Sequence, residues 1–360
     1  LAAIEAEGIA QQSAGAYAVA AGFEESRNNI PAEARYLENA LHFLPAQPVL
    51  LEKYASALLQ LGRVPEAVSA AERATHADPQ SGIAFAVLGY ADYKNEHNLE
   101  AIAAWKKSLQ LHPDDQVKQL LERAERESRT EAHFRQEESS HFTLRYEGSQ
   151  APDELRQQIL SALESDYRDL QNDLGASPRN ITVSLYTDEA FLDVTHAPAW
   201  SAALNDGKIR IPISGMKTVR PELARVLRHE LTHSFIQQIT HGRAPQWLNE
   251  GIAELEQGAS TTAFGSRLAV LYGTGHQIPL SQLEGNFDDY SQTEASVAYA
   301  EGLAAVEYIQ KTYGMGDLAR ILQRLGDGQS IESALRSTVH AGYKEFETEL
   351  TKYLKESYGA

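Results

Sequence analysis

Two histidines lie close enough in the sequence to share one metal ion, and a glutamate lies between them. The segment reads His229-Glu230-Leu231-Thr232-His233. On a helix, residues four apart lie on one face, so both imidazoles can bind the same zinc ion. Glu230 then projects beside them as a general base for a water molecule. This spacing predicts metal-assisted hydrolysis.

A second carboxylate motif offers the third metal ligand. It reads WLNEGIAE from Trp247 to Glu254, and sixteen residues separate His233 from Glu250. That distance allows a loop and a returning helix, so Glu250 can complete a set of two His and one Glu with a fourth position for water. We expect Glu254 to accept a hydrogen bond from a ligating histidine, although it is also within reach as the third ligand. Asn249 is expected either to support the ligands or to bind substrate backbone.

Both motifs need helices to position them. Apolar periodicity predicts one helix over residues 221–242, where Pro221 suits the first turn and Gly242 the end. A shorter helix is predicted between Pro245 and Gly258. Because Gly251 has no side chain, we expect these two helices to approach each other closely at that residue.

The rest of the second half reads as a small sheet followed by helices, an α+β order. Alternation of apolar and polar residues predicts three strands, and the residues Asn-Asp-Gly predict a hairpin turn. A helix is predicted to end at Gly175. The strands are residues 141–146, 181–186 and 208–213, the hairpin turn is at 205–207, and the helix covers 152–174. A charged helical tail is predicted over residues 119–140.

The first third of the chain carries a repeat. Pro45, Pro79 and Pro113 recur every 34 residues, and Ala67 and Ala101 each precede a proline by 12 residues. This pattern resembles tetratricopeptide repeats, in which each unit is a helix pair. The alternative is a generic helical bundle with coincidental prolines. We predict a helical-repeat domain over residues 1–135 and an α+β metal domain over 136–360, so that the chain is predominantly helical.

Composition narrows the choice of partners and location. The 360 residues include 32 Lys+Arg and 50 Asp+Glu, a net charge of −18, and no cysteine. A protein this acidic repels phosphate backbones, so nucleic acid is not an expected partner. The absence of cysteine excludes disulfides and cysteine-ligated zinc. No apolar run approaches the ~20 residues that cross a bilayer, so no membrane span is predicted.

HExxH followed by NExxxE resembles the gluzincin metallopeptidases. The segment PQWLNEGIAE, with repeats on its N-terminal side, is similar to bacterial peptidase-MA-like proteins. The resemblance extends over most of residues 139–360. Residues 297–302 (VAYAEG) are similar to the Y-x-x-G segment of gluzincin aminopeptidases. That resemblance implies that the Tyr299 hydroxyl stabilises the oxyanion. The aminopeptidase Gly-x-Met-Glu-Asn motif is absent, and the corresponding edge strand is GKIRIPISG.

These features predict a zinc-dependent peptidase with one zinc ion. Glu230 takes a proton from the attacking water and passes it to the leaving amine. Tyr299 stabilises the oxyanion by a hydrogen bond, and His241 and His276 are less favoured donors for the same role. The substrate backbone pairs with the KIRIPI strand. The alternative is a repeat scaffold with an inactive or structural metal domain. Hydrolysis of a different bond is a third option.

Two further expectations concern partners and location. We expect a peptide or protein substrate and a protein partner on the repeats, which present concave binding surfaces. The resemblance, together with a first residue that is Leu1 and not Met, predicts a periplasmic or secreted protein. The cytoplasm stays open as the alternative location.

Overall fold

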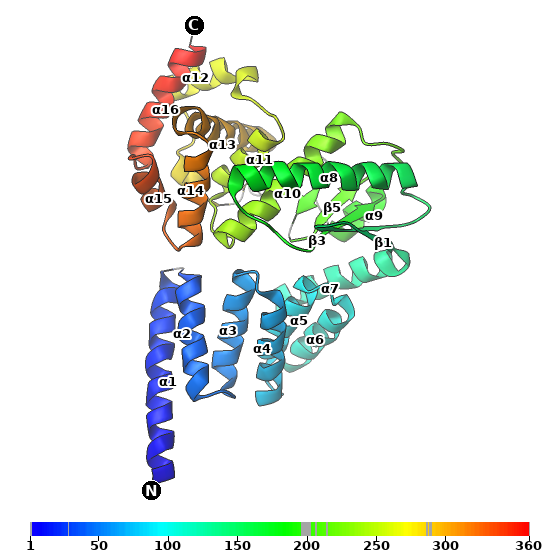
Figure 1. The fold of residues 1–360 in the computed structure, drawn as a ribbon, viewed down its shortest axis with the longest axis vertical. Coiled ribbons are helices and arrows are strands. Elements are labelled where there is room, and N and C mark those ends of the chain that lie inside the picture. Colours follow the sequence, from blue (N-terminus) through cyan, green and yellow to red (C-terminus); the bar gives the residue numbers. More distant parts are fainter. Residues whose placement is uncertain are drawn as a thin grey trace. The chain divides into compact units, whose positions relative to one another are not determined.

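The computed structural model describes residues 2–27, 29–195, 203–205, 207–213, 215–285, 287 and 290–359. In this part of the chain the protein is predominantly helical, with helices α1–α16 and one five-stranded sheet. One compact unit comprises Leu1–His133 and Asp193–His196, and the other comprises Phe134–Leu192 and Ala197–Ala360 (Figure 1). No helix among the described residues is long and apolar enough to cross a membrane.

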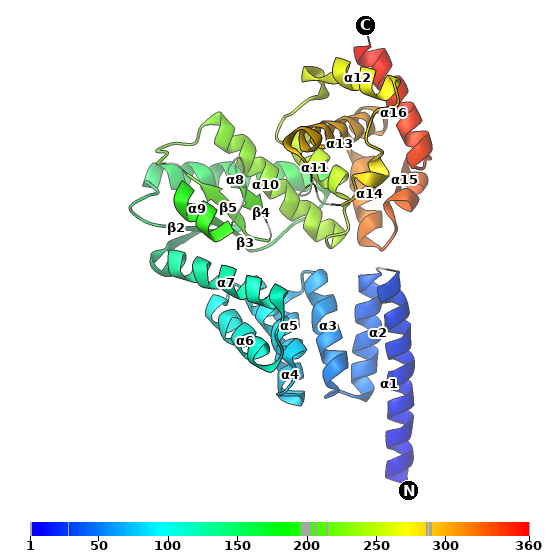
Figure 2. The same cartoon turned by 180° about the vertical axis from the view of Figure 1, so that it is seen from behind.

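Helical repeats form the first unit, as predicted. Neighbouring helices pack side by side in chain order (Figure 2). Their bounds are α1 Ala2–Ser26, α2 Ile30–Phe43, α3 Pro48–Gln60, α4 Val64–Ala77, α5 Gly82–Lys94, α6 Asn98–Leu111 and α7 Asp115–Thr130. Pro45, Pro79 and Pro113 follow α2, α4 and α6, so each proline comes after the second helix of a pair.

Small residues permit the close packing of these helices. Ala67 of α4 and Ala101 of α6 are fully buried. A Cβ atom on Gly89 of α5 would lie 2.5 Å from the ring of Trp105, whose indole N–H donates to the carbonyl of Ala86. The indole therefore fits only against a glycine at residue 89.

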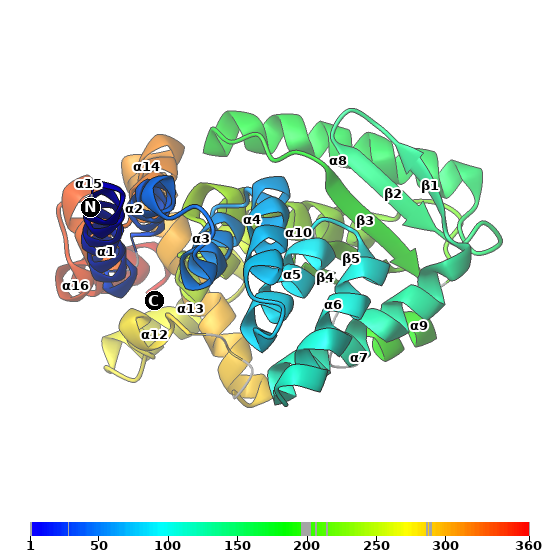
Figure 3. The same cartoon turned by 90° about the horizontal axis from the view of Figure 1, so that it is seen from below.

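The second unit contains a mixed sheet with the order β1-β2-β3-β5-β4 (Figure 3). The strands are β1 Arg135–Glu138, β2 Phe142–Tyr146, β3 Ile181–Tyr186, β4 Leu204–Asn205 and β5 Ile209–Pro212. The β2–β3 and β3–β5 pairs are parallel, whereas β1–β2 and β4–β5 are antiparallel. The three predicted strands correspond to β2, β3 and β5.

The prediction of a helical tail over residues 119–140 is wrong in its last part. Helix α7 ends at Thr130, a short 3-10 turn covers Glu131–His133, and β1 follows. Strand β1 is charged and mostly exposed, so it lacks the apolar alternation that reveals a strand. Its pairing with β2, with Arg135 opposite Tyr146, decides its conformation.

Residues 208–213 are expected to form an edge strand. This expectation is wrong for Ile209 and Arg210, which pair with a further strand. Strand β4 lies outside β5, with Leu204 opposite Arg210 and Asn205 opposite Ile209. The N–H of Gly207 donates to the side chain of Asn205, in keeping with the predicted turn, whose middle residue Asp206 lies outside the described residues. Ile209 and Arg210 therefore do not lie at the edge of the sheet.

Helices α8 (Asp153–Leu174) and α10 (Pro221–Thr240) pack together on the sheet, and α9 spans Asp188–Thr195 (Figure 1). Buried side chains on alternate residues of β2, Phe142, Leu144 and Tyr146, join the core of this unit. Gly175 ends α8, as predicted, and it adopts the left-handed conformation. The remaining helices are α11 Gln246–Glu256, α12 Gly265–Gly273, α13 Gln292–Tyr313, α14 Met315–Gly326, α15 Ile331–Thr338 and α16 Tyr343–Tyr358.

The close approach expected at Gly251 occurs, but with a different helix. A Cβ atom on Gly251 would lie 2.5 Å from the carbonyl oxygen of Gly302 in α13, and one on Gly302 would lie 2.7 Å from the carbonyl oxygen of Trp247. Helices α11 and α13 therefore touch backbone to backbone. The prediction of α10 as the neighbour at this residue is wrong, because spacing along the chain does not identify which helix packs where.

Replacing Gly251 with alanine is expected to lower the free energy of unfolding by about 1–3 kcal/mol, because a methyl group must displace a backbone carbonyl. Urea denaturation followed by circular dichroism measures this change. Gly316→Ala in α14 is the matched control, since a Cβ atom there meets no other atom within 4 Å. Equal stability of the two variants would contradict the backbone contact.

Candidate metal centre

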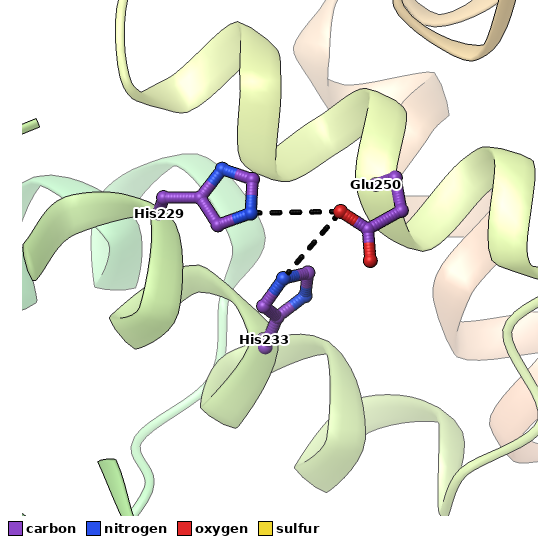
Figure 4. A group of neighbouring side chains, drawn as sticks. All are labelled: His229, His233 and Glu250. Carbon is purple, nitrogen blue, oxygen red and sulfur yellow. Dashed lines mark ion pairs between the residues drawn. The ribbon is translucent and has the colours of Figure 1, made fainter. Parts of the chain in front are cut away.

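His229 and His233 project from α10 toward Glu250 of α11 (Figure 4). The Nε2 atoms of His229 and His233 lie 3.5 and 3.8 Å from Oε2 of Glu250. The two imidazole centroids are 4.8 Å apart, with the ring planes at 85°. One face of α10 therefore directs both rings at a single carboxylate oxygen.

These three side chains can hold one metal ion. One ligand atom from each lies within 4.8 Å of the others. Tetrahedral zinc binds nitrogen and oxygen at about 2.1 Å, so its ligand atoms lie roughly 3.4 Å apart. Two of the separations, 3.5 and 3.8 Å, are close to that value. Two imidazoles and one carboxylate are also a donor set that suits zinc.

The surroundings of Glu250 favour its ionised form. Its side chain is largely buried, and burial raises its pKa. The neighbouring His233 and His229 outweigh burial, so the pKa lies below its ordinary value. Its Oε1 accepts a hydrogen bond from Nε2 of Gln246 at 2.9 Å. The carboxylate thus has one oxygen held by an amide and the other directed at the histidines.

Glu230 lies between the two histidines in sequence and is buried. Burial raises its pKa to about 7; the charge of Glu250 adds to this rise and His233 opposes it. The carbonyl of Glu230 accepts a hydrogen bond from Nδ2 of Asn205 at 2.7 Å, and the same amide donates to Ser234 Oγ at 2.8 Å. Asn205 therefore connects the edge strand β4 to α10 at the predicted base.

Asn249 lies beside a predicted ligand. Its amide oxygen is 3.1 Å from Nδ1 of His233 and accepts a hydrogen bond from it. With the proton on Nδ1, the lone pair of His233 is on Nε2, which faces Glu250. The role of Asn249, in supporting the ligands or in binding substrate backbone, stays a prediction.

The structure does not show the contact expected of Glu254. Its carboxylate accepts a hydrogen bond from Nε2 of Gln257 at 2.7 Å, and no hydrogen bond to either histidine occurs among the described residues. In the same part of the chain, Nδ1 of His229 is buried without a hydrogen-bond partner. Glu254 lies one turn after Glu250, but its side chain turns toward the end of α11.

Tyr299 lies half-buried on α13, one turn before Gly302 and so on the face of the helix that packs against α11. Its ring packs edge-on against Phe287, with centroids 5.5 Å apart. Its contact with an oxyanion stays a prediction. Of the less favoured donors, His241 ends α10 in the left-handed conformation and His276 is an exposed loop residue.

Sequence reasoning missed the network around Arg228, the residue before the first histidine. Its guanidinium contacts Glu256 of α11 at 2.6 Å, Asp166 of α8 at 3.0 Å and Asp169 of α8 at 3.3 Å. It also donates to the carbonyl of Glu256. Arg228 thereby holds α10 against α8 and α11. No local sequence motif predicts these contacts, because the partners of Arg228 lie far away in the sequence.

A family model described as the peptidase MA superfamily matches residues 166–356, more than half of the chain, and this range contains His229, His233 and Glu250. The chain belongs to the peptidase MA superfamily. The predicted resemblance is thereby confirmed at the level of the superfamily. In this member of the peptidase MA superfamily, the matched range begins within α8 and ends within α16.

The chain is also similar to a curated protein with a repeat in its name. "Small glutamine-rich tetratricopeptide repeat-containing protein 2" of Mycosarcoma maydis is 31% identical over 78 residues. The match covers 22% of this chain and 22% of that protein, so the chain spans about a fifth of the length of this relative.

Proposed function

We propose that this protein is a zinc-dependent peptidase of the gluzincin type. The observation that carries the proposal is the convergence of His229, His233 and Glu250 within 4.8 Å, inside a peptidase MA domain. The adjacent buried carboxylate of Glu230 supports a catalytic role for the site, because a structural zinc site does not need a base.

The proposed ligand atoms are Nε2 of His229, Nε2 of His233 and Oε2 of Glu250. Asn249 supports the site by holding the tautomer of His233 in which Nε2 carries the lone pair. Glu254 is proposed as a further support for the site, one turn after Glu250. Two histidines and one carboxylate leave a fourth position for water or substrate.

A bound zinc ion supplies a water molecule acidified toward neutral pH and a Lewis acid for the scissile carbonyl. Glu230 takes a proton from the attacking water and delivers it to the leaving amine. Tyr299 donates its hydroxyl proton in a hydrogen bond to the developing oxyanion. Asn205 holds the edge strand against α10, so a substrate backbone paired with that strand runs past the ligands.

The helical repeats are proposed to bind a protein partner or the substrate itself. Support comes from the three packed helix pairs of α1–α6 and from the similarity to a protein named for tetratricopeptide repeats. Such arrays present extended surfaces on which peptides dock. We place the boundary between the repeat and peptidase domains at residues 135 and 136.

Zinc uptake and peptide hydrolysis test this function together. The purified chain is expected to hold about one zinc ion after dialysis and to cleave members of a peptide library. A chelator should abolish cleavage, and added zinc should restore it. Failure to take up zinc, even after zinc is added back, would sink the proposal. Stoichiometric zinc without cleavage would favour a binding protein with a structural metal site.

A further inference from the structure

Gln246 makes a direct contact with the proposed carboxylate ligand. It lies one turn before Glu250 on α11, and its Nε2 donates to Oε1 of Glu250 at 2.9 Å. The other oxygen, Oε2, is the atom 3.5 and 3.8 Å from the two histidines. The two oxygens of this carboxylate therefore have different partners.

The orientation of the Gln246 amide follows from chemistry. An ionised carboxylate only accepts hydrogen bonds, so the amide must present its N–H group and not its carbonyl oxygen. A glutamate that binds a metal does so as the carboxylate. In the proposed site the hydrogen bond from Gln246 is therefore charge-assisted and stronger than one between neutral groups.

The backbone of Gln246 is held in place by a neighbouring loop. Gln246 is the first residue of α11, and its N–H donates to the carbonyl of Glu284 at 3.0 Å. The N–H of Trp247 donates to the carbonyl of Leu283 at 3.0 Å, and its buried indole donates to the hydroxyl of Tyr343 at 3.2 Å. That hydroxyl in turn donates to the carboxylate of Glu284. The N–H groups of the first two residues of α11 are therefore satisfied by the loop at Leu283 and Glu284, which Tyr343 links to Trp247.

We infer that Gln246 is a positioning residue that makes Glu250 bind the metal through Oε2 alone. A carboxylate with both oxygens free can bind through one or both of them, and the second oxygen would take the position that a catalytic site leaves open for water. The amide engages Oε1 and turns it away from the histidines. This inference rests on the proposed zinc site and adds a specific reason why that site stays open.

The test compares two glutamines. Gln246→Met removes the amide and keeps the length of the side chain. Gln171→Met in α8 is the matched control, because the exposed Gln171 donates to Oγ of Ser177 at 2.7 Å and neither residue belongs to the proposed site. Competition with a chromophoric chelator measures zinc affinity, which we expect to fall about 10–100-fold in Gln246→Met and to stay at the wild-type value in Gln171→Met.

The visible spectrum of the cobalt-substituted protein reports coordination separately from stability. Four-coordinate Co²⁺ absorbs more strongly than five- or six-coordinate Co²⁺, so Gln246→Met should weaken the absorption if Glu250 becomes bidentate. Thermal melting of the metal-free proteins shows whether each variant folds, and Gln246→Ala provides a second variant without the amide.

The outcomes separate this inference from the proposed function. Wild-type protein that binds no zinc contradicts the proposed function itself. Wild-type protein that binds zinc, with unchanged affinity and cobalt spectrum in folded Gln246→Met and Gln246→Ala, overturns the inference alone. A loss of affinity in Gln171→Met as large as in Gln246→Met also overturns it, since the loss would then not depend on contact with Glu250.

Discussion

Glu230→Gln is expected to retain one zinc ion per chain and to lose peptidase turnover by about 10²–10⁴-fold, the usual contribution of a general base. The substitution keeps the size of a buried side chain and removes only its capacity to accept a proton. Because Glu230 is not one of the three converging ligand residues, the zinc site should persist. Elemental analysis and steady-state hydrolysis of one peptide substrate measure the two quantities.

Glu222→Gln is the matched control for this experiment. Glu222 lies in the first turn of the same helix, and among the described residues its exposed carboxylate pairs only with Arg225, across 3.8 Å. Its loss should leave kcat/KM at the wild-type value, since an exposed pair of this kind contributes little. Undiminished hydrolysis by zinc-loaded Glu230→Gln would rule out Glu230 as the base and leave the metal site standing.

His233→Ala should lose the zinc ion and, with it, the activity. The substitution removes one of the three proposed ligands, the imidazole that contacts Asn249. Zinc should therefore no longer stabilise the folded protein; for a site with zinc at about 1,000 times its Kd, that stabilisation is about 4 kcal/mol. Elemental analysis after gentle dialysis and the shift in Tm on zinc addition measure these effects.

His276→Ala provides the comparison for His233→Ala. His276 is exposed in the loop after α12, and its Nδ1 contacts only the Thr274 hydroxyl among the described residues. This variant should bind zinc and melt like the wild type. Zinc retained at full stoichiometry in His233→Ala would mean that the ligand set differs from the one proposed, and Glu254 would be the first residue to examine.

Much of the local structure around the site could be predicted from short-range rules. Spacing of four residues puts His229 and His233 on one face of a helix, and this depends only on helical geometry. Pro221 and Gly175 mark a helix start and a helix end because of their restricted or permissive backbones. The repeating prolines likewise mark the ends of helices α2, α4 and α6.

Features that depend on partners distant in the sequence could not be predicted in this way. Strand β1 is too charged to reveal itself and forms because β2 offers an unpaired edge. The outer position of β4 depends on a two-residue pairing with β5. Gly251 signals that some backbone comes close, but only the folded structure shows that it belongs to Gly302 of α13.

The sequence by itself determined the chemical groups of the candidate site: two imidazoles one turn apart, a carboxylate between them, and a second carboxylate motif on a separate helix. Tertiary structure decided the contacts that support it: Gln246 on Oε1 of Glu250, Asn249 on His233, and Arg228 between α8, α10 and α11. The physical reason is that the spacing of residues on a helix depends only on the local backbone. Hydrogen-bond partners depend instead on how separate elements pack and on which side-chain rotamers that packing allows.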